Sequence, residues 1–256
     1  MNTHLKNSNS DYRQKFYARY VSAFKGLGGR NSRLHDYTFS DSKLIPLIKP
    51  WLENLSRDSR CLDLGCGHGN ILHALRTLGF QQLEGVDLSA EQVEIARREF
   101  PQVQVMGLME KLQTAPPASY NLITLFDVIE HLTKNEILDL FELVVSRLAL
   151  GGTFIVHCPN GDSPFVGTVR FGDFTHETIL TPLSARNLCN LFGLEDFEAG
   201  EHLGASTSLS GGCQAFAWGC LRFVLKTCMA IETGSSGSGI LTRNFAFKVS
   251  KKYRQL

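Results

Sequence analysis

Hydrophobic and polar positions follow two alternating spacings along residues 41–160 of the 256-residue chain. Short apolar runs typical of buried strands alternate with segments whose apolar residues recur every three or four positions, as in helices. The expected strands are the segment before the glycines at 65–69, then 83–89, 103–106, 120–128 and 151–159. The expected helices cover 41–55, 71–80, 90–100 and 133–148. This alternation predicts an α/β fold with a doubly wound, mostly parallel sheet.

Several helix starts carry capping signals. Ser40 or Asp41 can cap the first of these helices, Ser89 the third, and Thr133 or Asn135 the fourth. Short polar side chains at these positions accept hydrogen bonds from the first free backbone amides of a helix.

The pattern changes on both sides of this region. Residues 1–40 predict a polar leader with an aromatic helix at 11–25, which can act as a lid or pack on the fold. After residue 160 we expect loops at 160–181, 204–212 and 233–239, helices at 184–193 and 215–231, and a last strand at 244–252. We interpret residues 41–256 as the main domain, with an inserted substrate-covering cap at about 160–245. The apolar 215–231 helix can meet a lipid-linked substrate, a partner or the core; core or dimer packing is favoured.

Composition narrows the classes of function. Lys and Arg number 26 against 25 Asp and Glu, so the net charge of +1 gives no reason to expect a nucleic-acid partner. Seven cysteines without paired CxxC spacing argue against a disulfide framework or a zinc site. The polar start does not resemble a signal peptide, and Arg222 and Lys226 interrupt the longest apolar stretch. We therefore expect a cytoplasmic protein without a transmembrane segment, with a homodimer as one option.

Glycines at alternate positions, Gly65, Gly67 and Gly69, follow the first strand. Asn70 stands next, so the dinucleotide spacing GxGxxG is not met, and no Lys-Ser/Thr pair completes a phosphate loop. Asp87 ends the second strand, where an acid can bind ribose hydroxyls. Asp63 precedes the glycines, where it would repel a pyrophosphate but can hold a cationic amine. These charges predict a nucleoside joined to an amino acid, which describes S-adenosylmethionine.

Four segments, LDLGCGHGN, GVDLS, FDVIEHL and RLALGGTFIV, resemble in order and spacing the motifs of class I S-adenosylmethionine-dependent methyltransferases. The resemblance implies a Rossmann-like, seven-stranded sheet, a ribose contact at Asp87 and adenine packing on Leu88. The acid that often bonds adenine in the family is replaced by Leu108, which leaves Met109 and Glu110 as candidates. The expected cofactor-binding residues are Asp63, Gly65, Cys66, Gly67, Gly69, Asp87, Leu88, Met109, Glu110, Phe126 and Asp127.

Candidate acceptor-side residues form two clusters. In FDVIEHL, His131 can act as a general base. In similar quinone-pathway enzymes the acid and the histidine of this motif, here Glu130 and His131, help to bind a metal. Alternatively, His131 only holds the loop beside the cofactor. In RFGDFTHETILTP, Asp173 and His176 can form a base and its orienting acid, or else His176 only braces a loop. No metal is expected, although a divalent ion is compatible with these residues. His157 is interpreted as a core histidine.

The sequence as a whole predicts an S-adenosylmethionine-dependent O-methyltransferase with His131, His176 and Asp173 as catalytic candidates. Residues 173–194 and 232–252 are similar to methyltransferases of bacterial surface-polysaccharide and sugar pathways, so a sugar or glycan hydroxyl is the favoured acceptor. The alternatives are a metal-dependent quinone or phenol O-methyltransferase, a small-molecule N-methyltransferase, and a cofactor-binding partner protein without catalysis.

Overall fold

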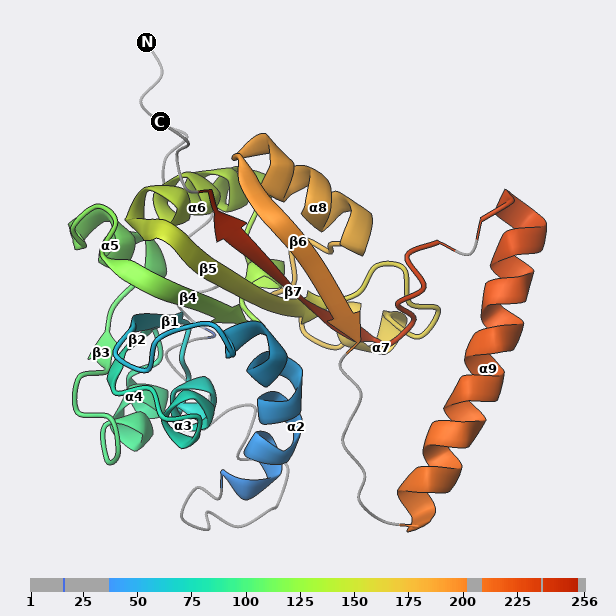
Figure 1. The fold of residues 1–256 in the computed structure, drawn as a ribbon, viewed down its shortest axis with the longest axis horizontal. Coiled ribbons are helices and arrows are strands. Elements are labelled where there is room, and N and C mark those ends of the chain that lie inside the picture. The colour runs from blue at the N-terminus through green and yellow to red at the C-terminus, as the bar shows by residue number, and fades with distance from the viewer. Residues whose placement is uncertain (1–15, 17–36, 202–208, 236, 253–256) are drawn as a thin grey trace.

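The computed structural model describes residue 16 and residues 37–201, 209–235 and 237–252. A seven-stranded sheet forms its centre, with the strand order β3-β2-β1-β4-β5-β7-β6 (Figure 1). The strands are β1 Arg60–Leu64, β2 Gln82–Asp87, β3 Gln104–Val105, β4 Tyr120–Phe126, β5 Leu148–Pro159, β6 Leu194–Glu201 and β7 Asn244–Lys251. β1 to β5 pair in parallel, while β7 is antiparallel to both β5 and β6. The predicted Rossmann-like, mostly parallel sheet is confirmed.

Helices cover both faces of the sheet (Figure 1). The helices are α2 Thr38–Ile48, α3 Asn70–Thr77, α4 Ala90–Ala96, α5 Leu108–Thr114, α6 Lys134–Arg147, α7 Gly167–Arg170, α8 Pro182–Leu191 and α9 Leu209–Thr233, with 3-10 turns η3 Lys49–Leu52 and η4 Ile129–His131. One face packs against α5, α6 and α8, and the other against α2, η3 and α3, with α4 beside α3. Neighbouring residues of a strand enter opposite cores, as Leu122 and Ile123 do, which explains the uninterrupted apolar runs.

Helix caps agree with the sequence at two places and differ at a third. Ser89 caps α4 by accepting from the Gln92 amide, and Thr133 caps α6 in a reciprocal pair with Glu136. The prediction of a cap at Ser40 or Asp41 is wrong, because α2 already begins after Tyr37. Asp41 is inside α2 and contacts the His73 Nδ1 atom at 2.9 Å, so tertiary pairing replaces the capping role.

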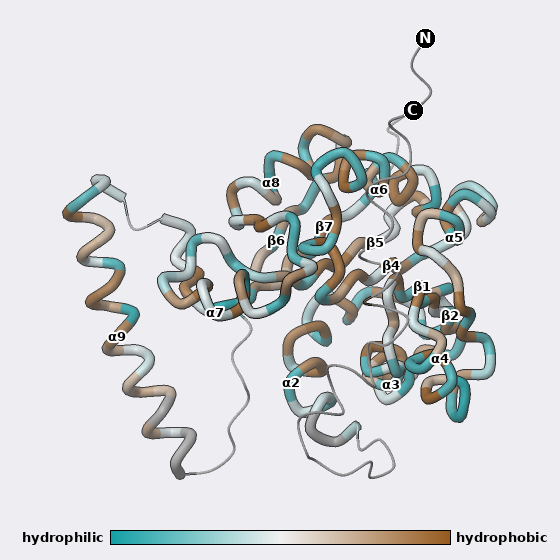
Figure 2. The backbone as a smooth tube through the Cα atoms, turned by 180° about the vertical axis from the view of Figure 1, so that it is seen from behind, coloured by the Kyte–Doolittle hydropathy of each residue, from teal (hydrophilic) through white to brown (hydrophobic). Residues whose placement is uncertain are grey.

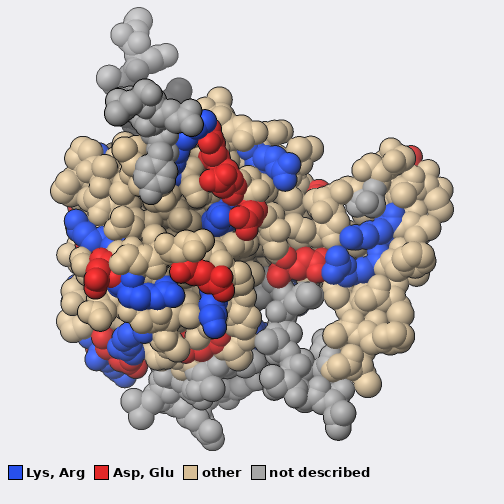
Figure 3. Space-filling view, in the orientation of Figure 1, with Lys and Arg blue, Asp and Glu red and all other residues tan. Residues whose placement is uncertain are grey.

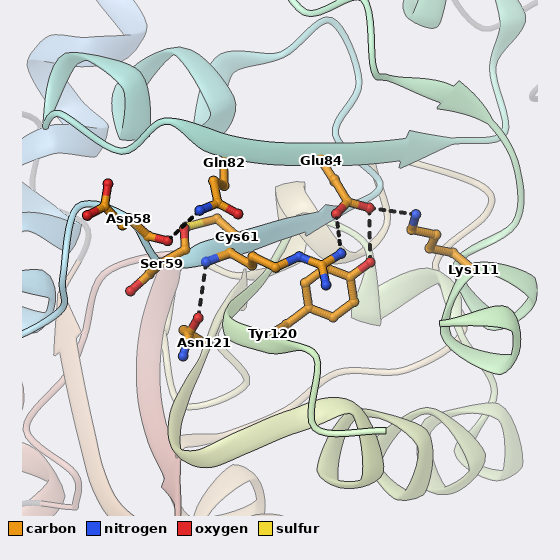
Figure 4. A network of polar contacts seen from close by, with 9 residues as sticks. Asp58, Ser59, Cys61, Gln82, Glu84, Lys111, Tyr120 and Asn121 are labelled. Atoms are coloured by element: carbon orange, nitrogen blue, oxygen red, sulfur yellow. Dashed lines mark hydrogen bonds and ion pairs between the residues drawn. The ribbon is translucent and has the colours of Figure 1, made fainter. Parts of the chain in front are cut away.

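A network of ion pairs and hydrogen bonds connects strands β1, β2 and β4 with helix α5 (Figure 4). Glu84 on β2 accepts from Arg60 of β1 and from Lys111 of α5, both at 2.8 Å, and from the Tyr120 hydroxyl at 3.0 Å. Burial raises the pKa of Glu84, but the hydrogen bonds from Lys111 and Arg60 outweigh it, so the pKa lies below its usual range. This network stabilises the sheet and is separate from the candidate active site, which lies at the carboxyl ends of the parallel strands.

The second half of the chain differs from its sequence-based interpretation. Within residues 160–245, β6 is the edge strand of the sheet and α8 packs on the core, so both belong to the main layers. The predicted loop at 204–212 is wrong for residues 209–212, which open α9; residues 202–208 lie outside the described part. The aromatic helix at 11–25 also lies outside it except for Phe16, whose ring stacks on Phe174 at 5.8 Å.

α9 stands apart from the sheet and its covering helices in both views (Figures 1 and 2). Phe216, Phe223 and Ile231 are exposed by 76%, 74% and 81%. Of the favoured core or dimer packing of this helix, core packing is therefore wrong for these residues, and dimer packing stays a prediction. None of the helices in the described residues is long and apolar enough to cross a membrane.

Candidate active site

The glycine turn lies where β1 ends, at the edge of the sheet that carries the carboxyl ends of the parallel strands. The amides of Gly65 and Cys66 both donate to the Val86 carbonyl, at 2.8 and 3.0 Å, which closes the turn onto β2. Gly65 has a φ of +74°, and a Cβ there would overlap a methyl group of Val128. Glycine is therefore required by conformation and by space. The contact also places the segment after β4 directly against the turn.

Asp87 at the end of β2 is oriented by backbone amides. One carboxylate oxygen accepts from the Gly67 amide at 2.8 Å and the other from the Ser89 amide at 2.7 Å. The next side chain, Leu88, is 57% exposed although it is apolar. An oriented carboxylate beside an exposed apolar side chain fits a nucleoside, whose ribose needs an acceptor and whose base needs an apolar surface.

Asp63 is a buried acid directly before the glycine turn, with 2% of its surface exposed. Its Oδ1 atom accepts from the Thr124 hydroxyl at 2.7 Å. Burial raises the pKa of Asp63 to about 7, against the lowering effect of the Thr124 hydrogen bond and with a smaller rise from Asp87. Burial likewise raises the pKa of the Cys66 thiol, so Cys66 contributes a neutral, apolar wall. A carboxyl group with this pKa can ionise when a cation approaches.

The remaining cofactor-side candidates lie in different surroundings. Met109 and Glu110 occupy the first turn of α5, after β3; Met109 packs partly against the core, whereas Glu110 is exposed. Gly69 precedes α3 with a φ of +94°, and a Cβ there would lie 3.1 Å from Phe100. The turn geometry therefore accounts for Gly69, while contacts of Glu110 with a cofactor stay a prediction.

Asp127 and His157 form a pair that the sequence interpretation missed. The His157 Nδ1 atom lies 2.7 Å from Asp127 Oδ1, and the Asp127 amide donates to the His157 carbonyl at 3.0 Å. The Phe126 ring stacks on the imidazole at 5.4 Å. His157 is buried, as a core histidine would be, but it holds an exposed acid at the edge of the sheet. The pairing depends on the register of β4 and β5, which aligns Phe126 with His157 and which the sequence does not state.

Glu130, His131 and His176 come together beyond β4. One potential ligand atom from each of the three lies within 4.8 Å of the others, the one such group of three found among the described residues. Burial raises the pKa of Glu130 well above its usual range, with a further rise from Asp127. Its Oε2 atom and the Nδ1 atom of His176 are buried and have no hydrogen-bond partner. Buried polar atoms without partners fit a group that binds there.

Thr175 connects Asp173 to His131. Its amide and hydroxyl both donate to Asp173 Oδ1, at 2.8 and 2.7 Å, and its Oγ1 atom lies 2.8 Å from His131 Nδ1. Asp173, the acid predicted to orient His176, is therefore connected to His131 through Thr175, and its part in orienting a histidine stays a prediction. The His176 ring meets the His131 ring edge-on, with centroids 4.8 Å apart. The contacts of His131 with Thr175 and with His176 join segments far apart in the sequence, so they cannot be inferred from the D-x-T-H spacing.

Two further residues support the glycine turn and were not predicted. The Tyr37 hydroxyl donates to the His68 carbonyl at 2.9 Å, and Gln92 Oε1 lies 3.0 Å from His68 Nδ1. Gln92 could have been suspected from its position on the buried side of α4, whereas Tyr37 stands in a segment that was interpreted as a leader.

A family model described as "Methyltransferase domain" matches residues 35–202, which is more than half of the chain. The chain belongs to this methyltransferase-domain family. The match, together with the fold, confirms the prediction of a class I S-adenosylmethionine-dependent methyltransferase and of its cofactor. It includes the glycine turn, Asp87 and both acceptor-side clusters.

Curated relatives are similar over the same region. A ubiquinone biosynthesis O-methyltransferase of Xanthomonas campestris pv. campestris (strain B100) is 32% identical over 107 residues, which are 40% of this chain and 44% of the relative. The corresponding enzyme of Neisseria meningitidis serogroup C (strain 053442) is 28% identical over 123 residues, 45% of this chain and 49% of the relative. The matches span about half the length of these relatives.

Solved structures share the fold at low sequence identity. A SAM-dependent methyltransferase from Archaeoglobus fulgidus superposes with a TM-score of 0.62 at 16% identity, covering 82% of this chain and 94% of the other. Human N-acetylserotonin methyltransferase in complex with SAM gives a TM-score of 0.56 at 15% identity, covering 94% of this chain and 58% of the other. At this identity the likeness is one of fold.

Proposed function

We propose that the protein is an O-methyltransferase in which His131 removes the proton of an acceptor hydroxyl. The observation that carries this proposal is the chain of contacts from Asp173 through Thr175 to His131, next to the segment that packs on the glycine turn. The matching relatives are named as O-methyltransferases, which supports oxygen as the methylated atom.

The hydrogen bonds support Nε2 as the basic nitrogen of His131. The Thr175 hydroxyl donates its hydrogen bond to Asp173, so the hydroxyl oxygen acts as the acceptor toward His131 Nδ1. The Thr175 carbonyl, 3.4 Å from the same nitrogen, is also an acceptor. Nδ1 therefore carries the proton, and Nε2 keeps the lone pair. Burial, and then the neighbouring His176, lower the pKa of His131, so the imidazole is neutral at physiological pH.

Each group has a defined task in the transfer. Bound S-adenosylmethionine supplies a methyl group on a sulfonium centre. Asp87 binds the ribose, and ionised Asp63 holds the amino group. His131 Nε2 would take the hydroxyl proton as the acceptor oxygen bonds to the methyl carbon and the sulfur–methyl bond breaks, which would leave S-adenosylhomocysteine. Asp173 is a positioning residue that keeps Thr175 as an acceptor.

Variants of the two histidines test this mechanism. His131→Ala should lower turnover by about 10²–10⁴-fold with cofactor affinity nearly unchanged. Thr175→Val should lower turnover less and move the pH profile, because Nδ1 loses its acceptor. Calorimetry with S-adenosylhomocysteine provides the binding control. Full turnover of His131→Ala contradicts the proposal that His131 is the general base. If His176→Ala also turns over fully on the same acceptor, N-methylation is favoured, because it needs less help from a base.

A metal-assisted phenol O-methyltransferase is the second candidate. It is favoured by the two buried atoms without partners, Glu130 Oε2 and His176 Nδ1, close to His131. Carboxylate and neutral imidazole together suit a divalent ion, which would lower the pKa of a bound hydroxyl. The relatives' names, which refer to ubiquinone biosynthesis, point to a phenolic acceptor for this candidate.

One comparison separates the two candidates and their acceptors. We propose a sugar or glycan hydroxyl as the first acceptor class, because residues 173–194 and 232–252 are similar to enzymes of polysaccharide and sugar pathways. Protein dialysed against EDTA is assayed on sugar nucleotides and on catechols, with and without Mg²⁺, Mn²⁺ or Zn²⁺. Turnover of sugars without metal supports the His131 base; turnover of catechols that requires metal, lost in Glu130→Gln, supports the second candidate.

A further inference from the structure

Three neighbouring strands each carry an acid at the edge of the sheet that holds the glycine turn. Asp63 lies near the end of β1, Asp87 ends β2, and Asp127 directly follows β4. Ligands of doubly wound sheets bind where the strand order reverses, which here is between β1 and β4. Asp127 therefore stands at the binding point, and the tasks given to Asp63 and Asp87 leave its own task open.

Asp127 is fixed through both its backbone and its side chain. Its φ is +54°, in the left-handed region that residues other than glycine adopt infrequently. Its amide donates to the His157 carbonyl at 3.0 Å, and its Oδ1 atom lies 2.7 Å from His157 Nδ1. An ionised carboxylate only accepts, so Nδ1 donates in this contact. Residues held in such a conformation gather at functional sites.

The exposure of the two partners shows which of them can meet a ligand. The His157 side chain is 2% exposed and that of Asp127 is 60% exposed. The Phe126 ring, stacked on the imidazole, holds the histidine from a further side. The histidine is thus the fixed part of the pair, and the carboxylate is the part that a ligand can reach.

Asp127 lies where the cofactor side and the acceptor side of the site meet. The next residue, Val128, fills the space beside Gly65 of the glycine turn. On the other side, burial and then the charge of Asp127 raise the pKa of Glu130, so the carboxylate is near the group that Glu130 forms with two histidines. A methyl group passes from cofactor to acceptor only if it lies between the two. The sulfonium that carries this methyl group is positively charged.

The surface as a whole gives no general attraction for a cation. The net charge is +1, and Figure 3 shows basic and acidic side chains interspersed over the face in view. Attraction for a cation therefore has to come from a placed side chain. S-adenosylmethionine has two cationic centres, an ammonium group and the sulfonium. Asp63 is proposed above to hold the first, which leaves the second for Asp127.

We propose that the Asp127 carboxylate, held by His157 as a positioning residue, attracts the sulfonium and so favours S-adenosylmethionine over its product, S-adenosylhomocysteine. Transfer of the methyl group removes the positive charge from sulfur, and the neutral thioether that remains loses this attraction. The pair then helps to exchange spent cofactor for fresh cofactor. The proposal rests on the cofactor of the family and is independent of the acceptor and of His131 as a base.

Calorimetric titration of the full-length protein with both cofactor forms tests this, and the ratio of the two affinities is the readout. Asp127→Asn should lower the affinity for S-adenosylmethionine about three- to tenfold more than that for S-adenosylhomocysteine. His157→Leu, which lacks a donor, should shift the ratio in the same direction, and His157→Asn, which retains a nitrogen donor, should shift it less. Asp162→Asn is the matched control. This acid follows β5 at the same edge and accepts from Ser238 at 3.0 Å, so its loss should leave the ratio unchanged.

A double variant separates positioning from a loss of packing. If His157 acts through Asp127, adding His157→Leu to Asp127→Asn should leave the ratio of affinities where Asp127→Asn alone puts it. A loss of packing lowers both affinities together and shows in urea unfolding.

Two results overturn the proposal. If Asp127→Asn changes both affinities equally, or neither, the carboxylate does not attract the sulfonium. If the shift caused by His157→Leu persists in full in the Asp127→Asn background, His157 does not act through Asp127. Failure of the proposed proton transfer appears in turnover and leaves these titrations unchanged, so the two failures can be distinguished.

Discussion

Asp63 gives the sharpest quantitative prediction, because its carboxyl group is enclosed in the core, where it accepts a hydrogen bond from the Thr124 hydroxyl. Burial raises its pKa from 3.8 to about 7. A group whose pKa is raised on folding binds its proton more tightly in the folded state. For an acid, the resulting loss of folding stability is absent below the pKa of the unfolded state. It grows as pH rises from about 4 to 7, and it is constant above pH 7.

The magnitude follows from the same shift. Each pKa unit corresponds to about 1.4 kcal/mol, so complete ionisation of Asp63 in the folded protein without cofactor costs ~4 kcal/mol. About 2–3 kcal/mol of this arises between pH 5 and pH 8. Asp63→Asn keeps an oxygen that accepts from Thr124 but cannot ionise. The free energy of unfolding of the variant should therefore rise relative to the wild type by that amount over this interval.

Urea unfolding of both proteins at pH 5 and pH 8 gives the difference in free energy of unfolding between variant and wild type at each pH. The change in that difference between the two pH values isolates Asp63, because the titration of all other groups cancels. Glu84→Gln is the matched control. Because the pKa of Glu84 lies below its usual range, the carboxylate is ionised across this interval, and its difference from the wild type should change little. An Asp63→Asn difference that is the same at both pH values would refute the assigned burial penalty.

Three further predictions concern the cofactor side. Because ionised Asp63 is needed to hold an ammonium group, affinity for S-adenosylhomocysteine should fall about tenfold from pH 8 to pH 6, and calorimetry on Asp63→Asn should show this dependence lost. Asp87→Ala should weaken binding by about 10- to 100-fold, measured in the same titration, since the ribose loses its oriented acceptor. Gly65→Ala should destabilise the fold by about 1–3 kcal/mol; Val128→Ala should restore part of this in urea unfolding, and no restoration would argue against the overlap.

The sequence predicted the fold and the class of cofactor because both follow from patterns that are local in the chain. The glycine turn and Asp87 belong to short motifs at strand ends, and a parallel sheet brings such ends to one edge whatever the lengths of the connections. The secondary-structure prediction was poorest where the hydrophobic pattern is weak, as in β6. β6 carries Glu195, Asp196 and Glu198, and such charges are typical of an edge strand exposed to solvent rather than of an apolar run.

The acceptor side could not be assembled from motifs. Glu130 and His131 were found together because they are adjacent, and Asp173 and His176 because they share a segment. Which acid orients which histidine depends instead on the contact between η4 and residues 173–178. The amides of Glu177 and Thr178 both donate to the Glu130 carbonyl, at 2.8 and 3.0 Å, and this fixes the two segments side by side.

That backbone contact has a consequence for mechanism. Because it aligns residue 175 with residue 131, the intervening hydroxyl of Thr175, rather than a second carboxylate, meets the His131 imidazole. A direct Asp–His pair would raise the pKa of the histidine through its charge. A hydroxyl relay sets the tautomer while burial keeps the pKa of His131 low. In the proposed mechanism, the imidazole therefore stays neutral at physiological pH and can accept the proton of the acceptor hydroxyl.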